Sequence, residues 1–298
     1  MLLFLGNGIL LPASHADEIA IIFPEVREPY LTMFSSVADG VSQEFGQNIN
    51  KLILPGSSQA EDTSQWLIDN SISDVVVLGN KAISHQKNTT LNTVAGAYIL
   101  PPGTLEFSGI TLNPDSLFLF TELKKLRPDI KSIHAVYEEN KNQWVIDAAT
   151  ESAKSLGITL HAYPVSSMSE AASQYQKVQR RLNNRTEALW LPLNGPSRDK
   201  SILQRILDTA WSRDQIVISS NLSDSARGAL LSVQIDFTGL GRELGKLLKQ
   251  HKDKPETKPQ TLFANTLLKS INVRAAAHVG IQLKREELDE FEFIYPPQ

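Results

Sequence analysis

Polar and aromatic side chains recur in this sequence directly after short apolar runs that resemble buried strands. FPEVREPY (23–30) follows the first such run, and Gly79-Asn80-Lys81 follows the run DVVVL. If the strands are parallel, their carboxyl ends meet at one sheet edge, where small-molecule sites form. Taken singly, each such residue is more often a cap or a turn, but their shared position makes them a set. The candidate ligand-binding residues are Glu25, Tyr30, Asn80, Thr111, Tyr137, Asn194, Asn221 and Asp236.

The residue types needed for catalysis are sparse. None of the six His forms an HxxxH pair of the metalloprotease kind, and neither a GxSxG elbow nor a P-loop is present. The chain has no Cys, which excludes disulfides, thiolate zinc sites, iron–sulfur clusters and Cys nucleophiles. We therefore expect a binding protein rather than an enzyme, with no cofactor and no metal.

One glycine pattern permits two interpretations. Gly239, Gly241 and Gly245 follow a predicted strand and open a predicted helix, as in a dinucleotide-binding turn. The spacing is GxGxxxG rather than GxGxxG, and the acidic residue expected about 20 residues later is absent. Close packing of the helix on the sheet is the favoured interpretation.

The first sixteen residues have the pattern of an export signal. Residues 2–11 contain one polar residue, Asn7, and are too few to span a bilayer, which needs about 20. Ser14 and Ala16 place small residues at positions −3 and −1 of a cut after Ala16. No basic residue precedes the apolar run, so a buried first strand or helix is the alternative. We expect a signal peptide over 1–16 and a periplasmic mature chain, without the Cys that would anchor a lipoprotein.

The remaining chain alternates strand and helix patterns. Apolar residues at helical spacing predict helices, and continuous apolar runs predict parallel strands covered on both faces. The predicted strands are residues 18–23, 50–54, 74–78, 95–100, 132–137, 158–165, 188–193, 215–220, 230–235 and 262–268. The predicted helices are residues 30–45, 60–69, 115–126, 142–156 with Asn142 as N-cap, 169–182, 199–211, 239–250 and 273–279.

Two successive βαβαβα runs imply an α/β fold of two doubly wound parallel-sheet lobes joined by a hinge. We assign residues 17–113 and about 236–262 to the first lobe, and 114–235 and about 263–298 to the second. Two such lobes suggest a clamshell that closes on a small molecule.

Charge and composition narrow the function classes. The 298 residues include 29 basic and 33 acidic side chains, for a net charge of −4. This balance argues against a general nucleic-acid binder, which neutralises phosphates with a basic surface. A hydrophobic content of 41% excludes wholesale disorder.

Three segments resemble the ABC-transporter substrate-binding family whose known members bind aromatic amino acids. Residues 107–140 are similar to its hinge segment, residues 227–248 to a strand–helix unit, and residues 270–283 to its terminal helix. The matching positions in the last two segments are Gly228, Ala229, Ser232, Asp236, Gly241, Ile271, Asn272, Ala276, Gly280 and Ile281. The resemblance covers about residues 74–283.

The resemblance implies a type I periplasmic-binding-protein fold with three hinge crossings and a ligand between the lobes. It also implies that Thr111, Asn194 and Asp236 lie near the cleft. The family often has an Asp that pairs with a ligand ammonium where this chain has Asn194, and a neutral amide loses that charge-assisted bond. An amino-acid ligand would then need Glu25 or Asp236 to supply the charge.

Two functions remain open at this point. The first is a periplasmic solute-binding protein that captures a small molecule, such as an amino acid or a related compound, for the permease of an ABC importer. The alternative, favoured by the altered cleft residues, is a periplasmic ligand-sensing subunit that regulates a membrane histidine kinase or diguanylate cyclase. In either role we expect a monomer without nucleic-acid partners.

Overall fold

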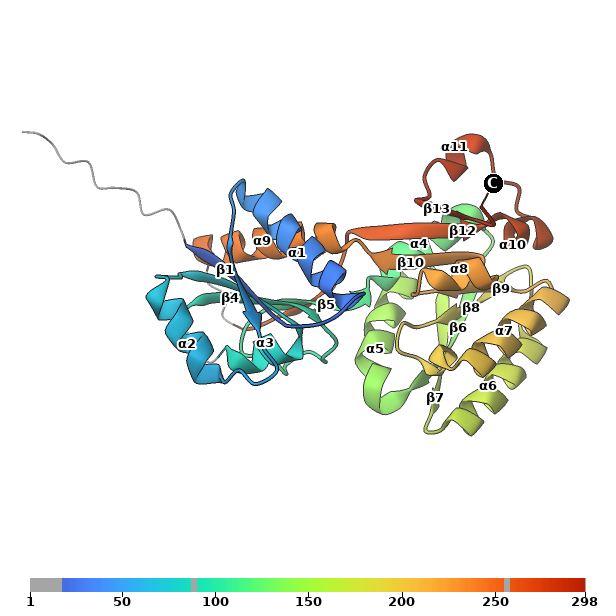
Figure 1. Cartoon of the computed structure of the whole chain (residues 1–298). Coiled ribbons are helices and arrows are strands. Elements are labelled where there is room, and N and C mark those ends of the chain that lie inside the picture. The colour runs from blue at the N-terminus through green and yellow to red at the C-terminus, as the bar shows by residue number, and fades with distance from the viewer. Residues whose placement is uncertain (1–17, 87–89, 255–257, 298) are drawn as a thin grey trace, which may run out of the picture.

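The computed structural model describes residues 18–86, 90–254 and 258–297. The expected signal segment and the cut after Ala16 lie outside these residues. Figure 1 shows two α/β lobes side by side, with β1 to β5 in one and β6 to β9 in the other. None of the described helices is long and apolar enough to cross a membrane.

The first lobe is built on a parallel six-stranded sheet with the order β11-β5-β4-β3-β1-β2. The successive side chains of β1 point to opposite faces of this sheet, and both faces are buried. Helices α1 (Tyr30–Phe45) and α9 (Phe237–Asp253) cover one face, and α2 (Ala60–Asp69) and α3 (Gly79–His85) cover the other. The strands are β1 (Ile19–Pro24), β2 (Asn50–Leu54), β3 (Asp74–Leu78), β4 (Asn92–Tyr98), β5 (Gly109–Pro114) and β11 (Thr261–Ala264).

The second lobe has a seven-stranded sheet with the order β13-β12-β10-β9-β8-β6-β7, in which only the β10–β12 pair of the described ladders is antiparallel. Its strands are β6 (Ser132–Glu138), β7 (Thr159–Val165), β8 (Glu187–Leu191), β9 (Ile216–Ser219), β10 (Leu231–Ile235), β12 (Leu267–Asn272) and β13 (Phe293–Tyr295). Helices α4 (Ser116–Leu126) and α5 (Glu139–Ser155) pack on one face, and α6 (Met168–Arg181) and α7 (Lys200–Ser212) on the other. The shorter helices are the 3₁₀ turn Pro196–Arg198, α8 (Ser223–Arg227), α10 (Val273–His278) and α11 (Arg285–Leu288). The predicted α/β class with two doubly wound lobes is confirmed.

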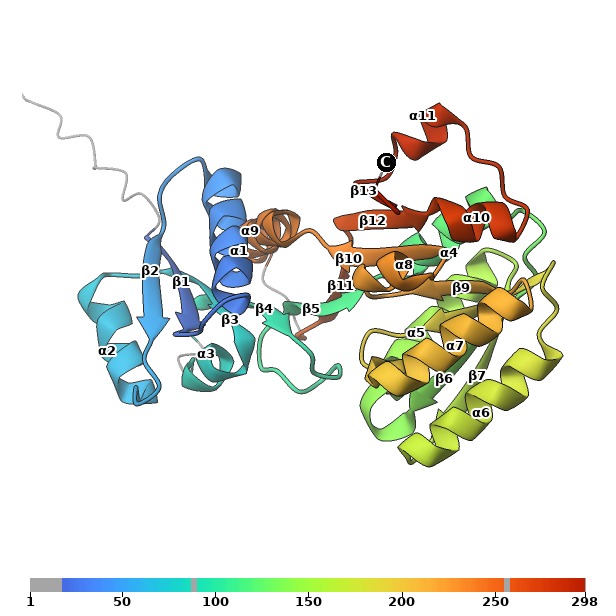
Figure 2. The same cartoon turned by 45° about the vertical axis from the view of Figure 1, so that its right-hand side comes forward.

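The chain crosses between the two sheets three times, the number that the resemblance implies. The crossings follow β5, β10 and β11, at Asp115, at Asp236 and at residues 265–266. They are hydrogen-bonded to one another, because the Asp115 amide donates to the Ala264 carbonyl and the Asp236 amide to the Thr266 carbonyl. Figure 2 shows the three segments converging between the lobes. Because the three connections lie side by side, any bending of one lobe relative to the other is restricted to this region.

The glycines of the GxGxxxG pattern serve helix packing. A Cβ added at Gly241 would lie 2.1 Å from the Val37 carbonyl oxygen, and one added at Gly40 would lie 2.0 Å from the Thr238 carbonyl oxygen. The glycines thus let α1 and α9 approach until their backbones touch. The packing interpretation is correct, but the partner at Gly241 is helix α1 rather than the sheet.

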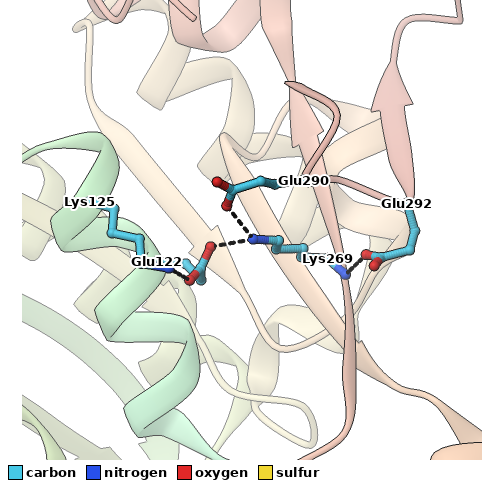
Figure 3. Close-up of polar contacts among 5 residues, drawn as sticks. All are labelled: Glu122, Lys125, Lys269, Glu290 and Glu292. Carbon is cyan, nitrogen blue, oxygen red and sulfur yellow. Dashed lines mark hydrogen bonds and ion pairs between the residues drawn. The ribbon is translucent and has the colours of Figure 1, made fainter. Parts of the chain in front are cut away.

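A network of charged side chains fastens the C-terminal segment to the second lobe (Figure 3). Lys269 on β12 lies 2.7 Å from a carboxylate oxygen of Glu122 on α4 and 3.1 Å from one of Glu290. Lys125 approaches the other oxygen of Glu122 to 2.6 Å, and the Lys269 amide donates to Glu292. Burial opposes ionisation of Glu122, but the bonds from the two lysines outweigh it and hold its pKa below the ordinary value. This network serves to hold the fold together.

The structure corrects several local predictions. The expected strand 262–268 is two strands, β11 and β12, which belong to different sheets and lie on either side of a crossing. Thr111, expected directly after a strand, lies within β5. Helix α5 begins at Glu139, so Asn142 lies inside its first turn and is not the N-cap. Helix α9 extends to Asp253, three residues beyond the predicted end at residue 250.

Candidate functional site

A pocket of about 880 Å³ takes its walls from both lobes. Ile99 and Pro101, which follow β4, form the wall from the first lobe. The second lobe supplies the start of α5 after β6, the segment 194–199 after β8, and Met168. Pockets that hold small ligands have volumes of about 300–1,000 Å³ and form at the carboxyl ends of strands. Its size and position make this pocket the candidate binding site.

Asn194 is the one predicted site residue that lines this pocket. Three others, Glu25, Tyr30 and Asn80, are exposed on the first lobe, with Tyr30 at 60%. Glu25 follows β1 and Asn80 follows the end of β3, while Ile99 follows the neighbouring strand β4. These residues therefore share the sheet edge that contributes Ile99, at increasing distance from the hinge.

Thr111 and Tyr137 are enclosed. Thr111 is fully buried in β5, where its hydroxyl donates to the Tyr98 carbonyl and accepts from Asn113. Tyr137 is 5% exposed, and its hydroxyl donates to Gln143 Oε1 at 2.6 Å. Burial, reinforced by the carboxylates of Glu139 and Asp147, raises the pKa of the Tyr137 phenol, so the phenol stays neutral. Since Gln143 lines the pocket, Tyr137 supports the pocket wall from behind.

Asn221 and Asp236 lie near the crossings and are engaged within the chain. Asn221 lines a second pocket of about 140 Å³ between the lobes, and its amide donates to Ser223 and Asp224. Asp236 caps α9 by accepting from the Thr238 amide and pairs with Arg242 at 3.4 Å. Asp236 thus orients the helix that begins at the second crossing. A role for either residue at a ligand stays a prediction.

The pocket contains residues that the sequence did not single out. Asn142 is 3% exposed, yet its side-chain nitrogen has no hydrogen-bond partner among the described residues, and the same holds for the enclosed nitrogen of Asn194. Asn142 was interpreted as a cap because Asn is common there, but α5 begins three residues earlier, at Glu139. The apolar part of the lining includes Ile99 and Met168, which are 40% and 45% exposed.

Trp144 joins the two lobes beside the pocket. Its indole stacks on the ring of Phe263 in β11, with 5.4 Å between centroids and 25° between ring planes. Trp144 belongs to α5 of the second lobe, and Phe263 to the sheet of the first. Such pairs contribute about 0.5–1.5 kcal/mol beyond the burial of their area. The stack therefore influences how the lobes are oriented at the pocket.

His134 forms a separate polar cluster at the edge of the second lobe. It lies 3.1 Å from the Tyr163 hydroxyl and 3.1 Å from Glu187, and it stacks on His161. Burial lowers the pKa of His134, despite the opposing carboxylate of Glu187, so the ring is held neutral. In the described part of the chain, no group of three or more His, Asp or Glu side chains is arranged to hold a metal ion.

Comparison with solved structures identifies the fold. An ABC domain from Streptococcus pneumonia in complex with L-Trp has 19% sequence identity and a TM-score of 0.52, with 93% of this chain and 99% of that chain covered. The ligand-free, open structure of a substrate-binding protein with adhesive properties from Clostridium difficile has 16% identity and a TM-score of 0.63, at the same coverage. This chain has the type I periplasmic-binding-protein-like fold.

The sequence comparisons add no closer relative to this type I fold. No protein-family model matches the chain, and no curated protein matches it. A conserved domain protein from Vibrio cholerae is a further structural neighbour, at 16% identity and a TM-score of 0.53. In open α/β sheets, ligands bind outside the carboxyl ends of the strands, where the 880 Å³ pocket lies.

Proposed function

We propose that this protein is a periplasmic solute-binding protein that captures a small molecule between its lobes and delivers it to an ABC importer. The observation that carries the proposal is the pocket of about 880 Å³, whose walls come from both lobes at strand ends. The substrate-binding neighbour with a TM-score of 0.63 and the signal-like residues 1–16 also support it.

Closure about the three crossings would act as the binding step. The first-lobe edge with Glu25, Tyr30 and Asn80 is exposed, and a hinge rotation would carry it toward the pocket wall on the second lobe. A ligand that contacts both lobes favours the closed form in proportion to its extra contacts there. The closed form is then the species that a membrane partner would recognise.

The proposal is tested by thermal denaturation against a library of amino acids, amines, amides and sugars. A ligand at 100 times its Kd adds about 2.7 kcal/mol to the free energy of unfolding. For domains of 150–250 residues this raises Tm by roughly 5–10 °C. Small-angle scattering should then show a smaller radius of gyration with that ligand. If no compound raises Tm, the proposed binding function fails.

The sensor alternative depends on Asn194, which stands where the resembling family often has an acid. Neighbouring genes separate the two roles. A permease gene with an ATPase gene beside it supports import. A lone sensor-kinase or cyclase gene supports signalling and would displace the importer proposal.

A further inference from the structure

Two carboxamides in the pocket are unpaired although they are enclosed. The side-chain nitrogens of Asn142 and Asn194 have no hydrogen-bond partner among the described residues, and both residues line the pocket. Buried polar groups in folded proteins are nearly always hydrogen-bonded, because an unpaired one is destabilising. A partner from outside the chain is the simplest explanation, so this inference rests on the proposed binding function.

Acidic side chains lie at the starts of both helices that border the pocket. Helix α7 is capped by Asp199, which accepts from the Ser201 and Ile202 amides. Bonds from the Ser201 hydroxyl and from these amides hold the pKa of Asp199 below its usual value, so it stays ionised. Helix α5 has Glu138 at its N-cap, without a capping bond, and Glu139 in its first turn. The start of α7 is therefore occupied, and two acidic side chains oppose a ligand carboxylate at the start of α5.

The charged side chains of the pocket carry a surplus of acid. Four carboxylates face two cations, and they are Glu138, Glu139, Asp147 and Asp199 against Lys141 and Arg198. Lys141 is itself paired with Glu138 at 2.6 Å. The pocket thus repels anions and attracts cations, and its enclosed hydrogen-bonding groups are neutral amides.

We propose that the pocket takes a small organic amine whose recognised oxygen belongs to a neutral carboxamide or hydroxyl group rather than to a carboxylate. The unpaired atoms are amide nitrogens, which donate, so they match the oxygen of a neutral amide or hydroxyl group. A carboxylate would also accept these bonds, but it would lie among four acidic side chains and only two basic ones. Ile99 and Met168 would contact the apolar part of the amine.

The first test measures stability without ligand. Asn142→Leu removes an unpaired buried amide, so Tm should stay unchanged or rise. The matched control is Asn272→Leu. Asn272 is also buried, at 8% exposed, but its amide donates to the Ser225 carbonyl and accepts from the Ala275 amide. Asn272→Leu should lower Tm clearly. An equal loss in both variants would show that Asn142 serves the fold, and the inference would be overturned.

The second test compares ligands that differ only in charge. Titration calorimetry at pH 6.5, where an α-amino group is protonated, would compare L-tryptophanamide with L-tryptophan and L-leucinamide with L-leucine. We expect each amide to bind about tenfold or more tightly than its parent acid, because the surplus of acidic side chains at the pocket repels the carboxylate of the acid. Asn142→Leu should weaken amide binding about tenfold.

The outcomes separate this inference from the proposed function. Tighter binding of the parent acids, or no binding of either amide, overturns the ligand class. The binding function then still stands if another compound of the library raises Tm. If no compound raises Tm at all, the function itself fails, whatever the stability of the Asn142→Leu variant.

Discussion

Replacing Gly241 with Ala tests whether backbone contact between α1 and α9 holds the first lobe together. The added Cβ would lie 2.1 Å from the Val37 carbonyl oxygen and 2.9 Å from the Val41 nitrogen. Both are backbone atoms, so no side-chain rotation can relieve the clash. The helices must separate, and overpacking of this kind costs about 1–3 kcal/mol. Alanine favours the helix over glycine by about 1 kcal/mol, which offsets part of this cost. Taking the upper part of that range for a backbone clash, we expect a net loss of about 2 kcal/mol.

Two further glycines provide the comparison. A Cβ at Gly245 on the same helix would meet side-chain atoms, Glu44 Cγ at 2.7 Å and Cβ at 2.9 Å, which yield more easily than backbone. We expect Gly245→Ala to be within about 1 kcal/mol of the parent, since the gain in helix propensity offsets the adjustment. At Gly56 a Cβ would meet nothing within 4 Å, so Gly56→Ala serves as the neutral control.

Thermal and urea denaturation followed by circular dichroism measure the three variants. A loss of about 2 kcal/mol corresponds to a fall in Tm of roughly 4–8 °C for domains of 150–250 residues. The reasoning is refuted if Gly241→Ala is as stable as Gly245→Ala. In that case close packing does not explain the glycine spacing, and the dinucleotide-turn interpretation would need a binding test with NAD.

Four other perturbations follow from the described contacts. Lys269→Met should cost about 2–3 kcal/mol in urea denaturation, less than the usual loss for a fully buried pair because Lys125 still faces Glu122. The lowered pKa of Glu122 adds stability that is present above its unfolded pKa and disappears as the pH falls through the folded one, so Glu122→Gln should flatten acid denaturation. The lowered pKa of His134 makes stability depend on pH in the same direction. Its contribution is complete above about pH 6.5 and is lost in more acidic solution, and a His134→Gln variant should lack this dependence in a Tm-against-pH series. Trp144→Ala should lower Tm and increase the radius of gyration, since it removes the stack on Phe263 across the lobes, and an unchanged radius would exclude a role in lobe orientation.

Local pattern was enough for the fold class and for most elements. Continuous apolar runs such as residues 74–78 predict strands buried on both faces, and β3 is buried throughout. The prediction for 262–268 failed because both halves have strand-like residues, and nothing local says that the chain changes sheets at residues 265–266. The connection between the two sheets is held by Glu243, whose carboxylate accepts from the Asn265 and Thr266 amides, 22 and 23 residues away.

The candidate site was predicted in outline only. Asn194 was predicted because it follows a strand, and it lines the pocket. Tyr137 was predicted for the same reason, but it lies behind the pocket wall. Arg198 and Met168 reach the same pocket from elements whose sequences show no sign of it. Thr111 was expected after a strand, but it lies within β5, where its hydroxyl is bonded inside the sheet.

The sequence by itself determined the alternation of strands and helices, the two-lobed class and the absence of cysteine chemistry, because these depend on residue type and short-range spacing. Only the tertiary structure decided which side chains face the pocket, and which of them remain without a partner. Asn142 shows the reason. An amide in the first turn of a helix is satisfied or left unpaired by the atoms that the fold places around it, and these lie far away in the chain.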